Sequence, residues 1–183
     1  MSLPMRGRRL LLRPLEDKDS AALFAAVAAS REALRRRLRW ATAVASLEHC
    51  RGFIRASARA RARGQRQDFG VFETRAGELA GVASLQAMLA APGLAEVSGW
   101  IRADRQGRGL AVEAGRLLVA HAFKSALQQK LYARLDPANR AARRVVQDLG
   151  FRYEGCLRRE KRLHSRWIDQ ECWGLLQAEW RSK

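Results

Sequence analysis

The sequence predicts an α/β (α+β) domain built around a mixed, mostly antiparallel sheet that is flanked by helices. Three patterns predict it: a strand–turn–strand pair, a strand–helix–strand crossover that makes two strands parallel, and a pair of long strands late in the chain. In order, these patterns occupy residues 68–74 and 78–86, then 94–102, 109–127 and 130–135, then 152–163 and 166–178.

The first elements of the chain are a strand and two helical stretches. Arg9–Pro14 predicts a strand that is ended by proline. The helix that follows begins at Asp19 or Ser20, either of which suits the N-cap position, and runs through Ala29. A separate stretch, broken or bent, is expected from residue 32 to about residue 38.

The next helix carries a regular charge pattern. Ser46 predicts its N-cap and Gly64 its end. Arginines at positions 51, 55, 59 and 63 recur every four residues and therefore form a positive stripe along one face. The stripe fits two interpretations equally well, a solvated helix face or a surface for a polyanionic partner.

The later elements are a helix and two strands. Asn139–Leu149 predicts a helix that Gly150 ends, and the final strands turn near His164-Ser165. No repeat or linker interrupts the sequence, so residues 1–183 are expected to form a single domain.

The composition argues against several classes of protein. Of the 183 residues 48% are hydrophobic, and no apolar run is long enough to span a membrane or to form a signal peptide. Cys50, Cys156 and Cys172 are scattered, and the three histidines lack partners at ligand spacing. We therefore expect a cytoplasmic protein with no disulfide framework, no metal and no membrane contact.

Charge is the most unusual property of the composition. The formal net charge is +17, from 30 Arg and 5 Lys against 18 acidic residues. Residues 31–66 carry eleven Arg against two Glu, and residues 134–166 carry ten basic residues against four acids. This clustering indicates either biased codon usage on solvated faces or a polyanionic partner, namely CoA phosphates, an acidic protein or RNA.

One loop has the features of a phosphate-binding site. Gln106–Ala111 lies between the strand at 94–102 and the helix that follows it. Gly107 and Gly109 permit unusual φ angles, so backbone N–H groups can turn inward and add to the positive end of the helix dipole. Arg105 and Arg108 are expected to add mobile positive charge at the rim. The loop is therefore predicted to bind a pyrophosphate.

Two other phosphate-binding motifs do not fit this loop. A Rossmann fingerprint requires Gly or Ala at the position of Val112 and an acid about twenty residues on, where Gln128-Gln129 stands. A P-loop requires Gly-Lys-Ser/Thr, which is absent from the loop. The remaining match is Gln106-x-x-Gly109-x-Ala111, a short pattern whose position between strand and helix strengthens it.

The pattern and its context resemble the GNAT superfamily of N-acetyltransferases, and within it the RimJ/RimL-like branch of ribosomal-protein alanine and serine N-acetyltransferases. The similar segments run almost end to end. They are Arg9–Leu15 with Asp19, Arg31–Leu34 through Trp40, Ser46 with Phe53-Ile54, Glu96–Ile101, Glu113-Ala114, Ala122-Phe123, Asn139, Leu149–Phe151, Glu154–Arg158, Asp169 and Leu175–Trp180.

The resemblance implies the GNAT fold, in which a splayed pair of parallel strands holds acetyl-CoA as cosubstrate. Pantetheine would pair with the strand backbone at Trp100, Ile101 and Arg102. Asn139 would bond the pantetheine arm near the sulfur, a role compatible with capping a helix. The pyrophosphate would be held by Gln106, Gly107, Arg108, Gly109, Leu110 and Ala111.

Acetyl transfer requires a neutral amine, a donor for the tetrahedral oxyanion and a leaving thiolate. Val146 and Ala142 stand where relatives keep a hydroxyl, so we expect catalysis without a side-chain acid. Glu96 is the first choice for the general base, and Glu160 and Asp169 are second choices. Each of these carboxylates is also consistent with a purely structural role, in which it lies on a strand and pairs with a neighbouring arginine. The oxyanion donor is expected to be a backbone N–H of the splayed strand.

The predicted function is transfer of acetyl from acetyl-CoA to a primary amine, either a protein N-terminal amine or a small amine. The acceptor partners considered are a ribosomal protein or another acidic protein, and nucleic acid contact through the Arg-rich faces stays open. Two alternatives keep the GNAT scaffold with little catalysis: an RNA- or ribosome-associating protein, and an acyl-CoA sensor. The intact loop glycines favour the enzyme, whereas the missing hydroxyls mildly favour the alternatives.

Overall fold

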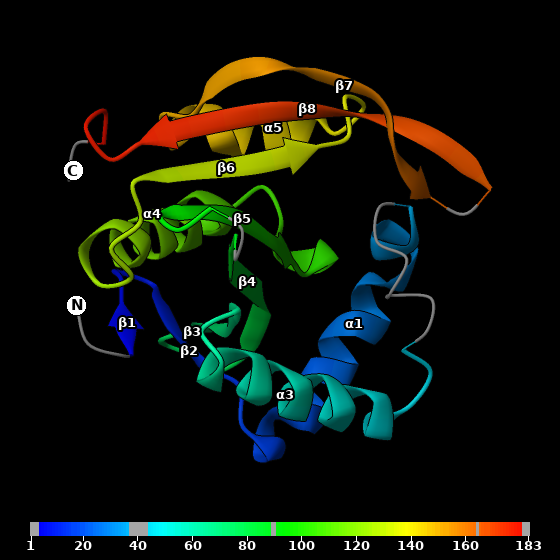
Figure 1. The fold of residues 1–183 in the computed structure, drawn as a ribbon. Helices are drawn as coiled ribbons and strands as arrows, with labels where there is room; N and C mark the ends of the chain where they lie inside the picture. The colour runs from blue at the N-terminus through cyan, green and yellow to red at the C-terminus, as the bar shows by residue number, and fades with distance from the viewer. Residues whose placement is uncertain (1–3, 37–43, 89–90, 164, 181–183) are drawn as a thin grey trace.

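The computed structural model describes residues 4–36, 44–88, 91–163 and 165–180. Within these ranges eight strands form one sheet, in the order β1-β2-β3-β4-β5-β6-β8-β7 (Figure 1). The strands are β1 Met5–Arg6, β2 Leu10–Pro14, β3 Arg66–Glu73, β4 Leu79–Ala87, β5 Leu94–Ile101, β6 Lys130–Leu135, β7 Arg152–Leu163 and β8 Arg166–Leu176. The helices are α1 Ser20–Arg35, α3 Leu47–Ala62, α4 Leu110–Lys124 and α5 Arg140–Asp148, with short 3-10 turns at Asp17–Asp19 and Ala103–Arg105.

The sheet is antiparallel at every junction except one. The β5 and β6 strands run parallel because α4 carries the chain back across the sheet between them. The predicted fold class is therefore confirmed, including the mixed, mostly antiparallel sheet and its single parallel pair.

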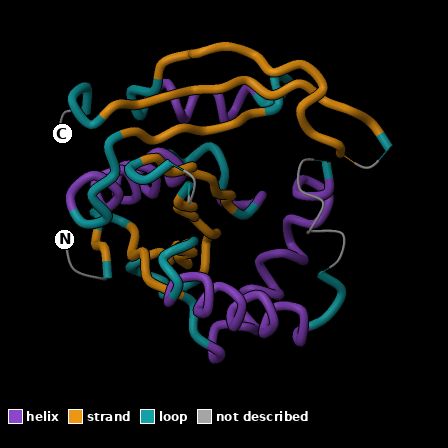
Figure 2. The backbone as a smooth tube through the Cα atoms, viewed as in Figure 1, coloured by secondary structure: helices purple, strands orange, loops and turns teal. Residues whose placement is uncertain are grey.

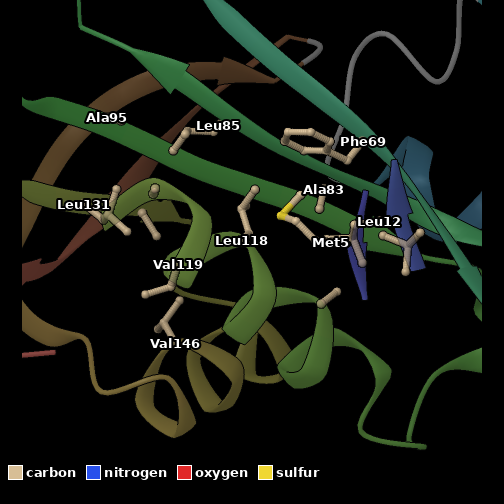
Figure 3. Close-up of a cluster of buried hydrophobic side chains, with 14 of the residues drawn as sticks. Met5, Leu12, Phe69, Ala83, Leu85, Ala95, Leu118, Val119, Leu131 and Val146 are labelled. Atoms are coloured by element: carbon tan, nitrogen blue, oxygen red, sulfur yellow. The ribbon is translucent and has the colours of Figure 1, made fainter. Parts of the chain in front are cut away.

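Two hydrophobic clusters cover opposite faces of the sheet. In β4, Ala83 belongs to the cluster that packs under α4 and α5, whereas its neighbour Val82 belongs to the cluster under α1 and α3. Successive side chains of this strand thus pack on opposite faces of the sheet. Figure 3 shows the first cluster, in which Leu118 of α4 lies over the sheet and Val146 of α5 lies beside α4.

Most elements agree with the prediction. The hairpin of β3 and β4 is confirmed, and Ser46 caps α3 by accepting a hydrogen bond from the His49 backbone N–H at 3.4 Å. The two-residue strand β1 was not predicted, and α4 ends at Lys124 rather than near Leu127. Two predicted features, the stretch beyond residue 36 and His164 in the last turn, lie outside the described residues.

The predicted break between Ala29 and Glu32 is wrong. Helix α1 continues without interruption through Ser30, a buried residue whose hydroxyl accepts a hydrogen bond from the Ala103 backbone N–H at 3.0 Å. That tertiary bond satisfies the serine, so its weak helix propensity does not end the helix. The same bond ties α1 to the segment that follows β5.

Asp19 occupies the N-cap position of α1, as predicted, but its side chain does not cap this helix. The carboxylate instead accepts two hydrogen bonds from the Arg13 guanidinium, at 2.7 and 2.8 Å, and one from the Glu16 backbone N–H. Asp19 therefore anchors the end of β2 to the start of α1.

Candidate active site

The predicted phosphate loop has a backbone shape that leaves N–H groups available. Gly107 and Gly109 have φ angles of 76° and 74°, in the left-handed region that favours glycine. Gly109 is the N-cap of α4 and offers no side-chain cap. The backbone hydrogen bonds described for the helix begin with Glu113 N to Gly109 O at 3.1 Å. The N–H groups of the first turn can therefore bind an anion, and the helix dipole favours negative charge there.

Side chains hold this loop in place from two sides. Gln106 folds back and donates from Nε2 to the Ile101 carbonyl at 3.0 Å. Arg9, far away in the sequence, donates from Nη1 to the Arg108 carbonyl at 2.9 Å. Gln106 thus braces the loop against the end of β5, a role its sequence position alone does not reveal.

The expectation that Arg105 supplies mobile charge at the rim is wrong. Its guanidinium lies 3.0 Å from a Glu73 carboxylate oxygen, also pairs with Glu78, and is only 22% exposed. Arg102 is tied in a similar way, since it donates to both oxygens of Asp104 at 3.0 and 2.9 Å. Arg108 is the exposed arginine of the loop, and its guanidinium donates to the Asp104 carbonyl at 3.1 Å.

A gap opens between the two parallel strands. They pair only at Leu94–Lys130, Ala95–Leu131 and Glu96–Tyr132. Beyond this point, 97–101 of β5 and 133–135 of β6 share no register pairs, and Figure 1 shows the two strands diverging. The expected splayed pair is present. Glu96 is the last residue of β5 that pairs with β6, and we call this point, where the two strands begin to diverge, the vertex of the gap.

Strand alternation decides which backbone groups of β5 face this gap. The Arg102 N–H bonds to Ala80 of β4 at 2.8 Å, so the even-numbered residues of β5 turn their backbone groups toward β4. Val97, Gly99 and Ile101 consequently turn theirs toward the gap. Of the predicted pantetheine contacts at 100–102, Ile101 is thus the residue whose backbone faces the gap. Val97 and Gly99 were not predicted, although the period of two within the strand could have identified them.

The side chains of the predicted contact residues lie on both faces of β5. Trp100 packs against the cluster under α1 and α3, whereas Ile101 is part of the cluster under α4. Asn139 caps α5, because its side-chain oxygen accepts a hydrogen bond from the Ala142 N–H at 3.2 Å. The capping role is confirmed, and within the described ranges the cap uses the side-chain oxygen of Asn139 rather than its amide nitrogen. Val146 is buried in the core and offers no proton.

Two of the three candidate carboxylates meet at one arginine. Arg134 of β6 lies 2.7 Å from Glu96 and 3.9 Å from Glu160. The hydrogen bond and the charge of Glu96 raise the pKa of Arg134, so this cation persists at any relevant pH. The register places Glu96, Tyr132 and Arg134 on the face of the sheet opposite α4. We call Glu96, Arg134 and Glu160 the carboxylate–arginine cluster.

The third candidate, Asp169, lies in a different arrangement. Its carboxylate accepts a hydrogen bond from the Arg159 backbone N–H at 2.8 Å. Arg159 has a φ of 51° within an irregularity where the register of β7 shifts between Leu157 and Lys161. Asp169 thus stabilises the bulge from which Glu160 extends toward Arg134.

Tyr132 adds a protonated hydroxyl beside the vertex. Burial and the neighbouring Glu96 carboxylate raise the pKa of this phenol above its ordinary value. The hydroxyl lies 2.6 Å from the Met88 sulfur. The position of Tyr132 opposite Glu96 depends on the register of the parallel pair, which no local sequence pattern specifies.

Other predicted features have simpler surroundings. In the arginine stripe of α3, Arg51 pairs with Glu48, and Arg55 lies 3.5 Å from Asp17 and 3.7 Å from Glu48.

Within the described ranges, no three His, Cys, Asp or Glu side chains are grouped as metal ligands. No helix in the described part of the chain has the length and apolar character to cross a membrane.

The family comparison agrees with this geometry. The model of the acetyltransferase (GNAT) domain matches residues 9–152, which include the loop, the strand gap and α5. The chain belongs to the GNAT acetyltransferase family.

Two curated relatives match part of this GNAT chain. The probable N-acetyltransferase YjcK of Bacillus subtilis (strain 168) is 29% identical over 112 residues, which cover 61% of this chain and 62% of the relative. The uncharacterized N-acetyltransferase p20 of Bacillus licheniformis is 26% identical over 64% of this chain and 66% of its own length. The matched segment thus spans less than two thirds of either relative.

Solved structures share the GNAT fold along nearly the whole chain. RimL, a ribosomal alpha-N-protein acetyltransferase in complex with coenzyme A, superposes with a TM-score of 0.88 at 22% identity, covering 94% of this chain and 97% of RimL. Mycobacterium smegmatis RimJ, in complex with a CoA disulfide, gives a TM-score of 0.84 at 22% identity, covering 93% and 83%. At such identities these likenesses establish the fold.

Proposed function

We propose that this protein is an acetyl-CoA-dependent N-acetyltransferase of the RimJ/RimL-like branch. It acts as a single domain, residues 1–183, and its acceptor is a primary amine, either an N-terminal amine of a protein or a small amine. One observation carries the proposal: the strand gap that opens at Glu96 leads directly into the glycine-bounded loop at the uncapped start of α4. The gap and the loop together suit a pantetheine arm joined to a pyrophosphate.

Each part of the cosubstrate has a set of residues that fits it. Backbone N–H groups of the loop and of the first turn of α4 suit the pyrophosphate, with Arg108 as the exposed cation. The gap-facing carbonyl of Val97, both backbone groups of Gly99 and the N–H of Ile101 suit pantetheine, because an extended chain can pair there like an added strand. The Asn139 amide nitrogen suits the same arm. Bound acetyl-CoA supplies an activated acetyl thioester.

The chain's own groups account for the proton transfers. An acceptor α-ammonium has a pKa near 8 and must lose a proton before it can attack. Glu96, held by Arg134, receives that proton directly or through one water. The gap-facing N–H of Gly99 donates to the oxyanion as the tetrahedral intermediate forms. The thiolate then leaves without a side-chain acid from α5, where Ala142 and Val146 stand, and the second proton of the attacking nitrogen passes to water.

Binding of the cosubstrate can be tested before any acceptor is known. Acetyl-CoA should raise the melting temperature, since a ligand that binds only the folded state stabilises it. Gly109→Glu should abolish this increase, because the substitution puts bulk and negative charge at a left-handed position beside the pyrophosphate. Gly64→Glu is the matched control, since Gly64 has a similar φ of 67° and an added Cβ there has no atom within 4 Å.

The second stage of the test measures free CoA released during incubation with peptides and small amines. Acetylation of any primary amine supports the proposal. An increase in melting temperature with NAD and none with acetyl-CoA would refute the cosubstrate assignment. An increase with acetyl-CoA but no acetylation across the panel would favour the acyl-CoA sensor instead.

A further inference from the structure

We infer that the acceptor is a peptide or protein N-terminus followed within a few residues by acidic side chains, which bind at the end of the β7–β8 hairpin. The inference rests on the proposed acetyl transfer and names its substrate class. We call residues 158–169, without His164, the hairpin end. Figure 2 shows this hairpin extending past the rest of the sheet.

The hairpin end carries a concentration of positive charge, five basic residues against two acids. Its five cations make no ion pair with any other residue in the described ranges. Four of them are exposed and one, Lys161, is half-buried. The cations are Arg158, Arg159, Lys161, Arg162 and Arg166.

Neither of the two acids of the hairpin end forms an ion pair with one of its basic side chains. Glu160 faces the Arg134 guanidinium, and Asp169 accepts the hydrogen bond from the Arg159 backbone N–H. The surface that this segment presents to a ligand is therefore strongly positive, which favours an anionic partner.

The strand register connects this charge to the reaction centre. Cys172 of β8 lies opposite Arg134, and side chains of a strand alternate between faces. Arg166 therefore points to the same face as the carboxylate–arginine cluster. Lys161 does too, because it lies opposite Ile168. Lys161 and Arg166 thus lie on the face on which an acceptor amine would approach Glu96.

The spacing predicts where the acids of the acceptor lie. At about 3.3 Å per residue, Ile168 is about 13 Å and Arg166 about 20 Å along the strand from Cys172. An extended acceptor advances by about the same distance per residue. If its amine lies at the carboxylate–arginine cluster, its residues at about positions 5 to 7 lie beside Lys161 and Arg166.

The alternatives fit these charges less well. A polyamine would be repelled by the five cations, and RNA offers no aliphatic amine to acetylate. The other basic surface, the arginine stripe of α3, is partly neutralised by Glu48 and Asp17. It lies across the molecule from the hairpin in Figure 1. An acidic peptide satisfies both the carboxylates at the centre, which suit an ammonium, and the cations beyond them.

Three ten-residue peptides test the inference. They share an N-terminal Ala and differ only at the three positions 5 to 7, which are all Glu, all Gln or all Lys. We expect kcat/KM to be on the order of tenfold higher for the Glu peptide than for the Lys peptide, because opposite charge accelerates and strengthens association. The difference should shrink at about 0.5 M salt, where surface charges are screened. Fluorescence anisotropy of C-terminally labelled peptides measures the same preference without turnover.

Two charge-reversal variants locate the surface. Lys161→Glu/Arg166→Glu should remove or invert the preference for the Glu peptide while acetyl-CoA still raises the melting temperature. Arg59→Glu/Arg63→Glu makes the same change in charge on α3 and should leave the preference intact.

Three outcomes would overturn the inference. They are equal use of the three peptides by the wild type, equal loss of the preference for the Glu peptide in both variants, and tighter binding of a ten-nucleotide RNA than of the Glu peptide. Absence of acetylation alone would count against the proposed activity, and anisotropy would still decide the acceptor preference.

Discussion

Arg9 binds Glu113 through two donors, its backbone N–H at 2.7 Å and its Nε at 2.8 Å. The same guanidinium donates to the Arg108 carbonyl at 2.9 Å. Burial alone would raise the pKa of Glu113, but the hydrogen bonds from Arg9 outweigh it and lower that pKa. A residue before β2 thus fixes both the proposed pyrophosphate loop and the first turn of α4.

Arg9→Ala should therefore weaken cosubstrate binding. Without the guanidinium the Arg108 carbonyl loses its donor, and the loop samples conformations in which its N–H groups no longer converge. We expect the dissociation constant of acetyl-CoA, measured by calorimetry, to rise about tenfold, the scale of one charge-assisted hydrogen bond. The kcat at saturating acetyl-CoA should change little.

Arg8→Ala is the neighbouring control, since Arg8 is exposed and should leave the dissociation constant unchanged. Arg9→Lys should recover only part of the affinity, because an ammonium cannot reach Glu113 and the carbonyl with a planar fork. An Arg9→Ala protein that binds acetyl-CoA like the wild type would show that the loop holds its shape without this contact.

Local signals explain why the loop could be predicted. Gly107 and Gly109 follow a strand and precede an amphipathic helix, and all of these features lie within one stretch of sequence. The gap in the sheet was expected from the family resemblance. Its position at Glu96 depends on the register of β5 against β6, which no local pattern specifies.

Long-range pairs account for what the sequence did not predict. Arg105 was expected to be mobile, yet Glu73 and Glu78 of the preceding hairpin neutralise it. Arg134 was not singled out, because its partners Glu96 and Glu160 come from different strands. An ion pair between distant segments leaves no periodicity in either segment, so composition shows the charges but not their pairing.

Asp169 can be distinguished as a base or a structural residue by two substitutions. Asp169→Asn cannot accept a catalytic proton, but its side-chain oxygen can still accept the hydrogen bond from the Arg159 N–H. We expect Asp169→Asn to keep most of the wild-type kcat. Asp169→Ala leaves that N–H without its partner and loosens the bulge that carries Glu160, so kcat/KM for the acceptor should fall several-fold. An Asn variant as inactive as a lost general base would instead make Asp169 the base.

His121 predicts a pH dependence of stability. It is buried on α4, its Nε2 pairs with the Gln67 side-chain oxygen at 2.8 Å, and no partner for Nδ1 exists in the described ranges. Burial lowers the pKa of His121. The unfolded chain, with a histidine pKa of about 6.5, then binds more protons as the pH falls, so stability is complete above about pH 6.5 and declines below it.

The expected loss between pH 7.5 and 5.5 is up to about 1 kcal/mol in the free energy of unfolding. Urea unfolding at both pH values measures it. His121→Gln cannot titrate and keeps a donor for Gln67. The difference in free energy of unfolding between this variant and the wild type should therefore narrow or reverse toward low pH. If that difference is the same at the two pH values, His121 is not the group responsible.

The general base is the last group to be tested, and the structure offers a matched pair for it. Glu96 lies at the vertex of the strand gap, 2.7 Å from Arg134, whereas Glu160 is 3.9 Å from the same guanidinium and more exposed. Glu96→Gln keeps a hydrogen-bond acceptor for Arg134 but cannot take a proton. Turnover should fall by roughly 10²-fold, the scale of a lost general base, with little change in acetyl-CoA affinity. Glu160→Gln makes the same chemical change away from the vertex and should lower turnover only a few-fold. Full turnover by Glu96→Gln together with a large loss in Glu160→Gln would exchange the two roles, and would place the acceptor amine on the hairpin side of Arg134.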